Sequence, residues 1–323
     1  MIKVDLVTGF LGAGKTTFLL RYARYLMGQG LRIGILVYDH GAMNVDLPLL
    51  NELRGEKCEL ETLAGGCDAD CHRRRFRTKL IAMAMSGYDR VVIDPSGVFD
   101  MDEFFDILHE PPVDSWFEIG SILTILNAET EALLTDEMEY LLASEAACAG
   151  KLLLSKLPDK NPEQRASEIL KHLNQALSDI RCGRSFTETD LFCKDWSKLD
   201  AADFEILANA GYRNASYIKK YQTDMLRSTV HYFLHIHLPE SEIEPVIREI
   251  MEDSECGTIY RIKGTLPAAD GTFLSVNAEK NRITLSPTVI GQAVLIVIGE
   301  TLNREQIDTH LKAKNTDPEY VSI

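Results

Sequence analysis

The sequence lacks the features that mark several classes of protein. No run of about 18 apolar residues occurs along the chain, so we expect no membrane-spanning helix and no membrane partner. Lys and Arg number 34 against 49 Asp and Glu, and the net charge of −15 argues against nucleic acid as a main partner. The seven cysteines are an odd number in a chain of 323 residues, which is too long to need disulfides. Reduced thiols, and a first predicted strand at residues 1–7 that leaves no room for a signal peptide, predict a cytoplasmic protein.

One stretch near the amino terminus carries a specific motif. Residues Gly9–Thr16 read GFLGAGKT, the G-x-x-x-x-G-K-[ST] pattern of a phosphate-binding loop, between an apolar run and an amphipathic segment. The glycines let backbone N–H groups wrap a polyphosphate, Lys15 suits the β- and γ-phosphates, and the Thr16 hydroxyl suits Mg²⁺. The motif therefore predicts nucleoside triphosphate binding. The residues that we assign to it are Gly9, Gly12, Ala13, Gly14, Lys15, Thr16 and Thr17.

Apolar runs and helical patterns alternate along residues 1–185. Runs at 33–38, 90–93, 121–126 and 151–154 are typical of buried parallel strands, and helical patterns occur at 78–85, 101–108, 135–147 and 162–177. This alternation predicts a doubly wound α/β domain with a mainly parallel sheet and its ligand at the carboxyl ends of the strands. Residues 186–228 indicate a helical linker region, with helical patterns at 203–210 and 215–221. Residues 229–323 predict a smaller α+β domain with an antiparallel sheet.

Acidic side chains follow two of the predicted strands. Asp94 ends the run at 90–93, where a carboxylate completes a Mg²⁺ shell, and the N–H of Gly97 is placed to reach the γ-phosphate. The alternative is that Asp94 only begins a turn. Asp39 and Asp46 follow the run at 33–38, where such proteins keep an element that senses the γ-phosphate; they are candidates for orienting the attacking water, or ordinary loop residues.

Two cysteines lie close together in the segment that precedes the helical pattern at 78–85. Cys67 and Cys71 are four residues apart and meet on one face if the segment is helical, with Asp70 and His72 nearby. Thiolate and imidazole ligands suit Zn²⁺ and other borderline metals. The alternative is two ordinary cysteines at the start of a helix, because this spacing is less diagnostic than C-x-x-C.

A candidate base-recognition segment follows the run at 151–154. Ser155, Lys156 and Asp159 occupy the place where GTP-specific proteins of the phosphate-loop class recognise guanine. An Asp there accepts from guanine N1–H and N2–H₂, a contact that adenine cannot make. The alternative is a plain loop between a strand and a helix.

Together these motifs resemble the CobW-like GTPases, which are related to the UreG and HypB nickel-insertion proteins. The loop TGFLGAGKTT is very close to the family's form, 39–46 fall on its Asn-Glu-Phe-Gly and a later Asp, and 94–97 on its Glu-x-Ser-Gly. Residues 258–264 and 294–306 are similar to its appended domain. Three motifs depart from the family pattern. Residues 66–72 replace Gly-Cys-x-Cys-Cys with only Cys67 and Cys71, Pro158 stands at the Asp of Asn-Lys-x-Asp with Asp159 one place late, and Asp94 replaces Glu.

The resemblance implies a Mg²⁺-dependent GTPase that acts as a metallochaperone or in metallo-cofactor assembly of the cobalamin type. It implies Zn²⁺ or Co²⁺ as cargo, a client metalloprotein or pathway protein as partner, and a nucleotide-dependent homodimer. Two other hypotheses stay open. The altered motifs also suit a nucleotide-gated maturation module with weak or no hydrolysis, or ATP in place of GTP.

Overall fold

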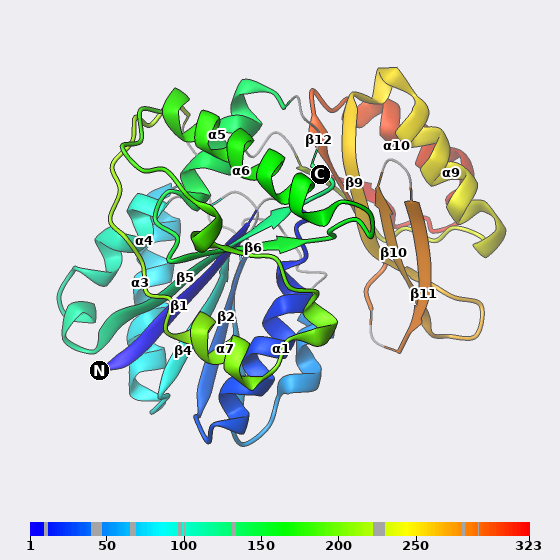
Figure 1. Ribbon diagram of the computed structural model, residues 1–323. Coiled ribbons are helices and arrows are strands. Elements are labelled where there is room, and N and C mark those ends of the chain that lie inside the picture. The colour runs from blue at the N-terminus through cyan, green and yellow to red at the C-terminus, as the bar shows by residue number, and fades with distance from the viewer. Residues whose placement is uncertain are drawn as a thin grey trace. The chain divides into compact units, whose positions relative to one another are not determined.

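The computed structural model describes residues 1–9, 12–39, 47–64, 69–95, 99, 101–130, 134–221, 230–279, 282–289 and 291–323 (Figure 1). The chain divides into two compact units. One consists of Met1–His40 with Leu49–Thr223, and the other of Gly41–Pro48 with Asp224–Ile323. None of the helices within the described ranges combines the length and the apolar character that crossing a bilayer requires.

The first unit contains a seven-stranded parallel sheet in the order β3-β2-β4-β1-β5-β6-β7. Every residue of β4 is buried, as expected of a parallel strand that is covered on both faces. The order reverses around β1, and sheets of this kind bind their ligands beside such a reversal, at the carboxyl ends of the strands. The strands are β1 (Ile2–Gly9), β2 (Ile33–Asp39), β3 (Cys58–Ala64), β4 (Arg90–Pro95), β5 (Phe117–Asn127), β6 (Lys151–Ser155) and β7 (Leu191–Phe192).

Helices follow the strands of this sheet in the alternating order that the sequence predicts. Local signals fix several of their starts: Thr135 accepts a hydrogen bond from the Met138 N–H, Pro162 begins a helix, and Asp200 forms a capping box. The helices are α1 (Lys15–Gly28), α2 (Leu47–Leu50), α3 (Ala69–Met85), α4 (Met101–Leu108), α5 (Asp136–Ala146), α6 (Pro162–Asp179) and α7 (Ala201–Ala208), with 3₁₀ turns η1 (Asn51–Leu53), η2 (Val113–Ser115), η3 (Glu188–Asp190) and η4 (Trp196–Lys198).

A buried charged cluster joins β1, β4 and α1. Asp5 is fully buried; it accepts a hydrogen bond from the Tyr22 hydroxyl at 2.7 Å and pairs with the Arg90 guanidinium at 3.3 Å. Burial raises the pKa of Asp5, while Arg90 and Tyr22 oppose this rise. Because the pair lies in the interior, either partner alone would be an uncompensated buried charge.

The second unit packs two helices on an antiparallel sheet of order β11-β10-β9-β12-β8-β13. Buried and partly buried residues alternate along β10, the pattern of a strand with one face in the core. Apolar residues of α9 and α10, among them Ile247 and Ile307, complete that core. The elements are β8 (Val230–Leu234), α9 (Glu240–Glu252), η6 (Ser254–Cys256), β9 (Thr258–Pro267), β10 (Phe273–Glu279), β11 (Arg282–Thr288), β12 (Val294–Glu300), α10 (Arg304–Lys314) and β13 (Val321–Ser322).

The predicted fold class is confirmed, and three details differ from the prediction. The edge strand β3 and the two-residue strand β7 were not predicted, because neither is a continuous apolar run. Residues 215–221 are not helical, and of the segment 186–228 only α7 is an α-helix among the described residues. Residues 186–221 fall in the first unit, because β7 extends its sheet and Phe204 of α7 stacks on Tyr25 of α1 at 5.4 Å.

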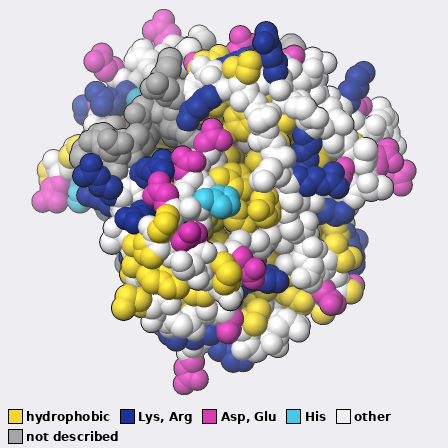
Figure 2. Space-filling view, turned by 90° about the vertical axis from the view of Figure 1, so that its left-hand side faces the viewer, with side chains coloured by type: hydrophobic (Ala, Val, Ile, Leu, Met, Phe, Trp, Pro, Cys, Tyr) yellow, Lys and Arg dark blue, Asp and Glu magenta, His cyan; other side chains and the backbone are white. Residues whose placement is uncertain are grey.

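Charged side chains of both signs are scattered among hydrophobic and other side chains on the face shown in Figure 2. Lys and Arg lie interspersed with Asp and Glu there and form no continuous basic surface on this face. On the face in view, the charge pattern is that of an ordinary solvated surface.

Candidate functional site

The predicted phosphate loop lies where β1 ends and α1 begins. Gly9, Gly12 and Gly14 have φ angles of 144°, 85° and 94°, which side chains other than hydrogen rarely allow. A Cβ at Gly9 would lie 2.4 Å from the Ile125 carbonyl oxygen, and a Cβ at Gly14 would lie 3.2 Å from the Trp196 ring. Residues 10–11 lie outside the described ranges. The described part of the loop therefore requires glycine both where the chain leaves the sheet and where it enters the helix.

The amino terminus of α1 offers backbone donors toward the loop. Among the described residues, no side chain caps this helix, and its first turn contains no acidic residue. The first N–H groups of a helix have no partner within it, and the helix dipole makes this end positive. The Lys15 ammonium bends back and donates to the Gly9 carbonyl oxygen at 2.8 Å. Ala13 is buried, Thr16 is half-buried and Thr17 is exposed. This arrangement is suited to an anion.

The carboxyl ends of β1, β4 and β2 lie side by side. Leu6 pairs with Ile93, and Val37 pairs with Asp94, so Asp94 and the backbone of Asp39 reach the same sheet edge as Gly9. Asp94 is 5% exposed. The structure thus brings Asp94 to the same edge of the sheet as the loop. Gly97, Asp46 and the side chain of Asp39 lie outside the described part of the chain.

The segment predicted to recognise the base follows β6. Ser155 is buried and its hydroxyl donates to the Leu126 carbonyl oxygen at 3.2 Å. Lys156 has a φ of 54° and pairs with Glu129 at 3.6 Å. Asp159 is exposed. The left-handed residue turns the chain sharply after the strand, so that Asp159 lies on a solvated loop.

Two of the predicted metal ligands lie in the first turn of α3. Cys71 is half-buried and His72 is buried, whereas Cys67 and the side chain of Asp70 lie outside the described residues. Consecutive helical residues point about 100° apart, so Cys71 and His72 do not share a face. Within the described residues the structure does not gather this ligand set, which stays a prediction.

A buried carboxyl group that the sequence analysis missed lies near the loop. Glu145 of α5 is 1% exposed, and within the described residues neither carboxyl oxygen accepts a hydrogen bond of normal geometry. Burial raises the pKa of Glu145 to about 8, and the nearby Lys15 ammonium and Gly9 amide oppose this rise without cancelling it. The available signal was an acidic residue inside the apolar run 140–147, YLLASEAA.

An aromatic side chain from the segment after β7 also reaches the loop. The Trp196 ring lies against Gly14 and packs edge-to-face on Phe18, with ring centroids 5.6 Å apart. Its segment was predicted to be a linker, so its position beside the loop was not anticipated. Trp196 is therefore placed to report on occupation of the loop.

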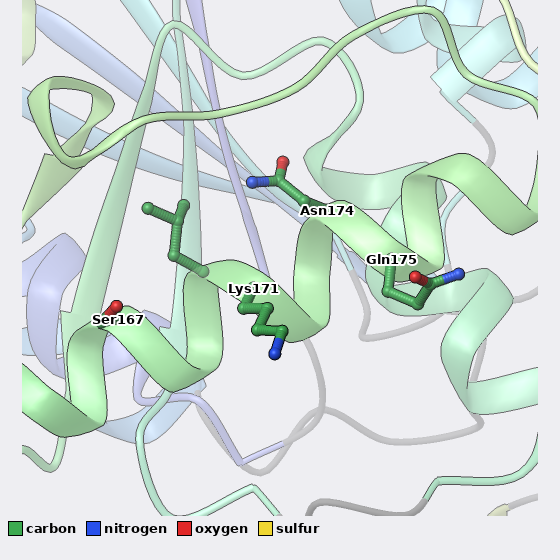
Figure 3. A pocket seen from close by; sticks show the side chains of 5 residues that line it. Ser167, Lys171, Asn174 and Gln175 are labelled. Atoms are coloured by element: carbon green, nitrogen blue, oxygen red, sulfur yellow. The ribbon is translucent and has the colours of Figure 1, made fainter.

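A surface hollow of about 410 Å³ lies along α6, away from any predicted site residue in the sequence (Figure 3). Two of its polar side chains already have partners: Asn174 binds the backbone of Phe186 in both directions at 2.8 Å, and Gln175 donates to Asp179 at 2.9 Å. One helix supplies the lining, and we assign no function to it.

Comparison with known proteins agrees with the site in the first unit. Residues 3–187 match the family model described as CobW/HypB/UreG, nucleotide-binding domain. The zinc chaperone YeiR of Escherichia coli is 29% identical over 138 residues, which are 42% of this chain and 40% of YeiR. The zinc chaperone YjiA of Escherichia coli is 27% identical over 189 residues, 54% of this chain and 55% of YjiA.

The likeness to these relatives is partial. The chain spans about half of the length of the two curated relatives. The crystal structure of Zn(II)-bound YjiA GTPase from E. coli aligns with 98% of this chain and 99% of that chain, with 17% identity and a TM-score of 0.35. At that level of likeness the structural alignment supports no conclusion about the site.

Proposed function

Because the chain belongs to the CobW/HypB/UreG nucleotide-binding domain family, we propose that it is a Mg²⁺-dependent GTPase that couples hydrolysis to delivery of zinc. The names of two relatives, both zinc chaperones, support zinc as the cargo. A client metalloprotein would be the acceptor, and a nucleotide-dependent homodimer is one arrangement in which the transfer would occur. Co²⁺ is the other cargo that the resemblance implies, and its delivery would serve cofactor assembly of the cobalamin type.

The observation that carries this proposal is the start of α1. Three glycines with left-handed φ angles precede a helix without a side-chain cap, and Lys15 already lies over the loop. Such a site has several N–H donors and one ammonium for a polyphosphate and, among the described residues, no carboxylate in the first helical turn to repel it.

The same edge of the sheet offers ligands for Mg²⁺. The Thr16 hydroxyl lies in the first turn of α1 and the Asp94 carboxylate is buried at the end of the neighbouring β4, and such oxygen donors suit this ion. Mg²⁺ bound there would neutralise charge on the phosphates. Asp94 is one methylene shorter than the family's Glu, which fits an ion that keeps several waters. Lys15 would hold the β- and γ-phosphates, and Gly97 would contact the γ-phosphate.

The proposed coupling lies between β2 and α3. Asp39 and Asp46 would sense the γ-phosphate and orient the attacking water, while Cys67 and Cys71, with Asp70 or His72, would hold the cargo. The strands β2 and β3 both end at the edge of the sheet where the phosphate loop lies. A change at the γ-phosphate would therefore alter the segments that follow both strands. The affinity of Cys67 and Cys71 for Zn²⁺ would then depend on whether the bound nucleotide has a γ-phosphate.

Substitution of the loop lysine tests nucleotide binding. Lys15→Ala should abolish binding of fluorescent GTP and turnover together, because the variant loses the charge that faces the phosphates. Lys3→Ala, an exposed lysine of β1, is the matched control and should bind as the wild type does. Unchanged GTP affinity in Lys15→Ala would contradict the proposal.

Turnover with and without Zn²⁺ separates the GTPase from a gated module without hydrolysis. The motif that favours the module is Pro158, which has no side-chain acceptor for guanine, next to the exposed Asp159. Zinc-stimulated hydrolysis that Cys67→Ser plus Cys71→Ser abolishes would reject the module. Competition of GTP against ATP decides the base, and preference for ATP would remove the roles of Ser155, Lys156 and Asp159.

A further inference from the structure

A cluster of metal-ligating side chains lies in the second unit, outside the region that the family model matches. Asp253 follows α9, Cys256 ends η6 and His310 lies in α10, and their ligand atoms all lie within 4.8 Å of one another. Cys256 is fully buried, while the side chains of Asp253 and His310 are each 23% exposed. The cluster therefore opens to solvent on one side.

One carboxylate oxygen organises this cluster. Asp253 Oδ2 accepts from His310 Nε2 at 2.8 Å, from the Cys256 thiol at 3.8 Å and from Gln306 Nε2 at 2.9 Å. Its other oxygen accepts from the Glu255 N–H at 2.9 Å and thereby caps η6. The hydrogen bonds from Gln306 and His310 hold the pKa of Asp253 well below its usual range. These hydrogen bonds fix the carboxylate in position.

A second carboxylate faces the other nitrogen of the imidazole. His310 Nδ1 lies 3.8 Å from Glu249 Oε2, on the opposite side of the ring from Asp253. A metal-bound histidine commonly donates its other ring N–H to a carboxylate, which fixes the tautomer and makes the ligand more basic. Glu249 and Gln306 therefore stand where the supporting partners of a metal site are found.

The local charge also favours a cation. Within the described residues no Lys or Arg forms an ion pair with Asp253. A second carboxylate, that of Glu249, lies beside the same imidazole.

We propose that Asp253, Cys256 and His310 form a binding site for Zn²⁺ or a similar divalent transition metal, with Glu249 as a positioning residue and solvent in the fourth place. Sulfur, imidazole nitrogen and carboxylate oxygen are the donors that zinc takes, at about 2.0 to 2.3 Å. Such bond lengths place tetrahedral donors roughly 3.3 to 3.7 Å apart. The Cys256–Asp253 separation of 3.8 Å is close to this, and the His310–Asp253 pair must open by about half an ångström.

The protons balance in this step. The Cys256 thiol releases its proton to solvent and binds the metal as thiolate. His310 exchanges its Nε2 proton, through solvent, for one on Nδ1, and that N–H faces the Glu249 carboxylate. Net, one proton leaves for each ion bound. The site needs neither GTP nor the thiols of Cys67 and Cys71, so it does not rest on the proposed function.

The test titrates the full chain carrying Cys67→Ser and Cys71→Ser with Co²⁺ alone. One equivalent should produce a thiolate-to-cobalt charge-transfer band, and Zn²⁺ should displace it. Adding Cys256→Ser should abolish the band. Adding His310→Gln should weaken cobalt binding by at least the roughly 10–100-fold that loss of a supporting partner costs, and Glu249→Gln should weaken it about tenfold with the band retained.

Two further measurements guard against misfolding and against other thiols. Cys193→Ser removes an exposed cysteine outside the cluster and should leave the band unchanged. If Cys256→Ser fails to fold, His310→Gln decides, because its amide still donates to Asp253. It should melt as the parent does without metal and should lose the rise in Tm that Zn²⁺ gives the parent. Absence of the band in the Cys67→Ser, Cys71→Ser protein, or its persistence in a folded Cys256→Ser variant, overturns the proposal.

Discussion

The phosphate loop and the Asp253–Cys256–His310 cluster are built in opposite ways. The loop consists of eight consecutive residues, and most of its donors are backbone N–H groups whose direction the glycines set, with the Lys15 ammonium beside them. The cluster takes side chains from positions as much as 57 residues apart, and its chemistry exists only because α9 and α10 pack together. A backbone site should therefore fail when its dihedral angles are changed and tolerate changes beneath it. A side-chain site should fail one ligand at a time.

Among the variants that test this comparison, the largest effect is expected from Gly9→Ala. The new Cβ would meet the Ile125 carbonyl oxygen at 2.4 Å, and a φ of 144° costs a residue other than glycine about 1–3 kcal/mol. GTP affinity should fall by more than about 100-fold, measured with fluorescent GTP. The cobalt band of the second unit should persist in the same protein.

A glycine in the following helix provides the matched control. A Cβ at Gly28 meets nothing within 4 Å, so Gly28→Ala should bind GTP normally and gain about 0.5–1 kcal/mol of stability. Normal affinity in Gly9→Ala, or a loss equal to that of Gly28→Ala, would break the comparison.

The next effect concerns stability beneath the loop. Arg90→Ala leaves Asp5 buried without its cation and should lower the free energy of unfolding of the first unit by about 3–5 kcal/mol. Both tryptophans, Trp116 and Trp196, lie in that unit, so their fluorescence during urea denaturation reports it. The folded fraction should still bind GTP within a few-fold of the wild type.

Removal of an exposed ion pair is the control for this change. Arg24 pairs with Glu52 at 2.8 Å, and both side chains are at least half exposed. Arg24→Ala should cost no more than about 1 kcal/mol. Equal costs for Arg24→Ala and Arg90→Ala would mean that the buried pair contributes nothing beyond a surface pair.

A smaller, pH-dependent effect is expected from Glu145→Gln. The pKa of Glu145 rises from 4.5 to about 8 on folding, so the folded state keeps a proton that the unfolded state loses. Wild-type stability should therefore fall relative to the variant as pH rises from about 4.5 to about 8, by a few kcal/mol in total. Urea denaturation at pH 5 and pH 8.5 measures this, and a difference between the two proteins that does not grow with pH would exclude burial of the neutral acid.

The smallest effect is optical. Trp196 lies against Gly14, so GTP should change the tryptophan fluorescence of the wild type and of Trp116→Phe but not of Trp196→Phe. GTP affinity, measured by calorimetry, should differ less than threefold among the three proteins. A signal that survives Trp196→Phe would place the nucleotide away from this ring.

Sequence patterns predicted the features of this protein that depend on residues close together in the sequence. The strands β2, β4 and β6 are continuous apolar runs because both faces are covered, and each was predicted within two residues. The edge strand β3 was missed because Glu59 and Glu61 alternate with its apolar residues; they pair with Arg32 and Lys79 at the rim of the sheet. The match of residues 3–187 to the family model confirms the family assignment. This assignment was possible from the sequence because the loop motif consists of consecutive residues.

Features that arise from packing were not predicted. Glu145 reaches the loop only because α5 packs on β1, and Trp196 only because β7 extends the sheet. The zinc-type cluster was missed for the same reason, since nothing near Cys256 in the sequence indicates His310. The residues assigned to metal and base between Asp39 and Asp159 stay predictions that the experiments above address.

The hydrogen bond from Lys15 to the Gly9 carbonyl bears on how readily the loop lets a nucleotide go. An ammonium that already rests on its own backbone exchanges one acceptor for another when phosphate enters, so part of the gross attraction cancels. In the proposed GTPase cycle, the lysine would return to this carbonyl when the diphosphate product leaves. That return would lower the cost of product release and would favour repeated cycles of loading and release.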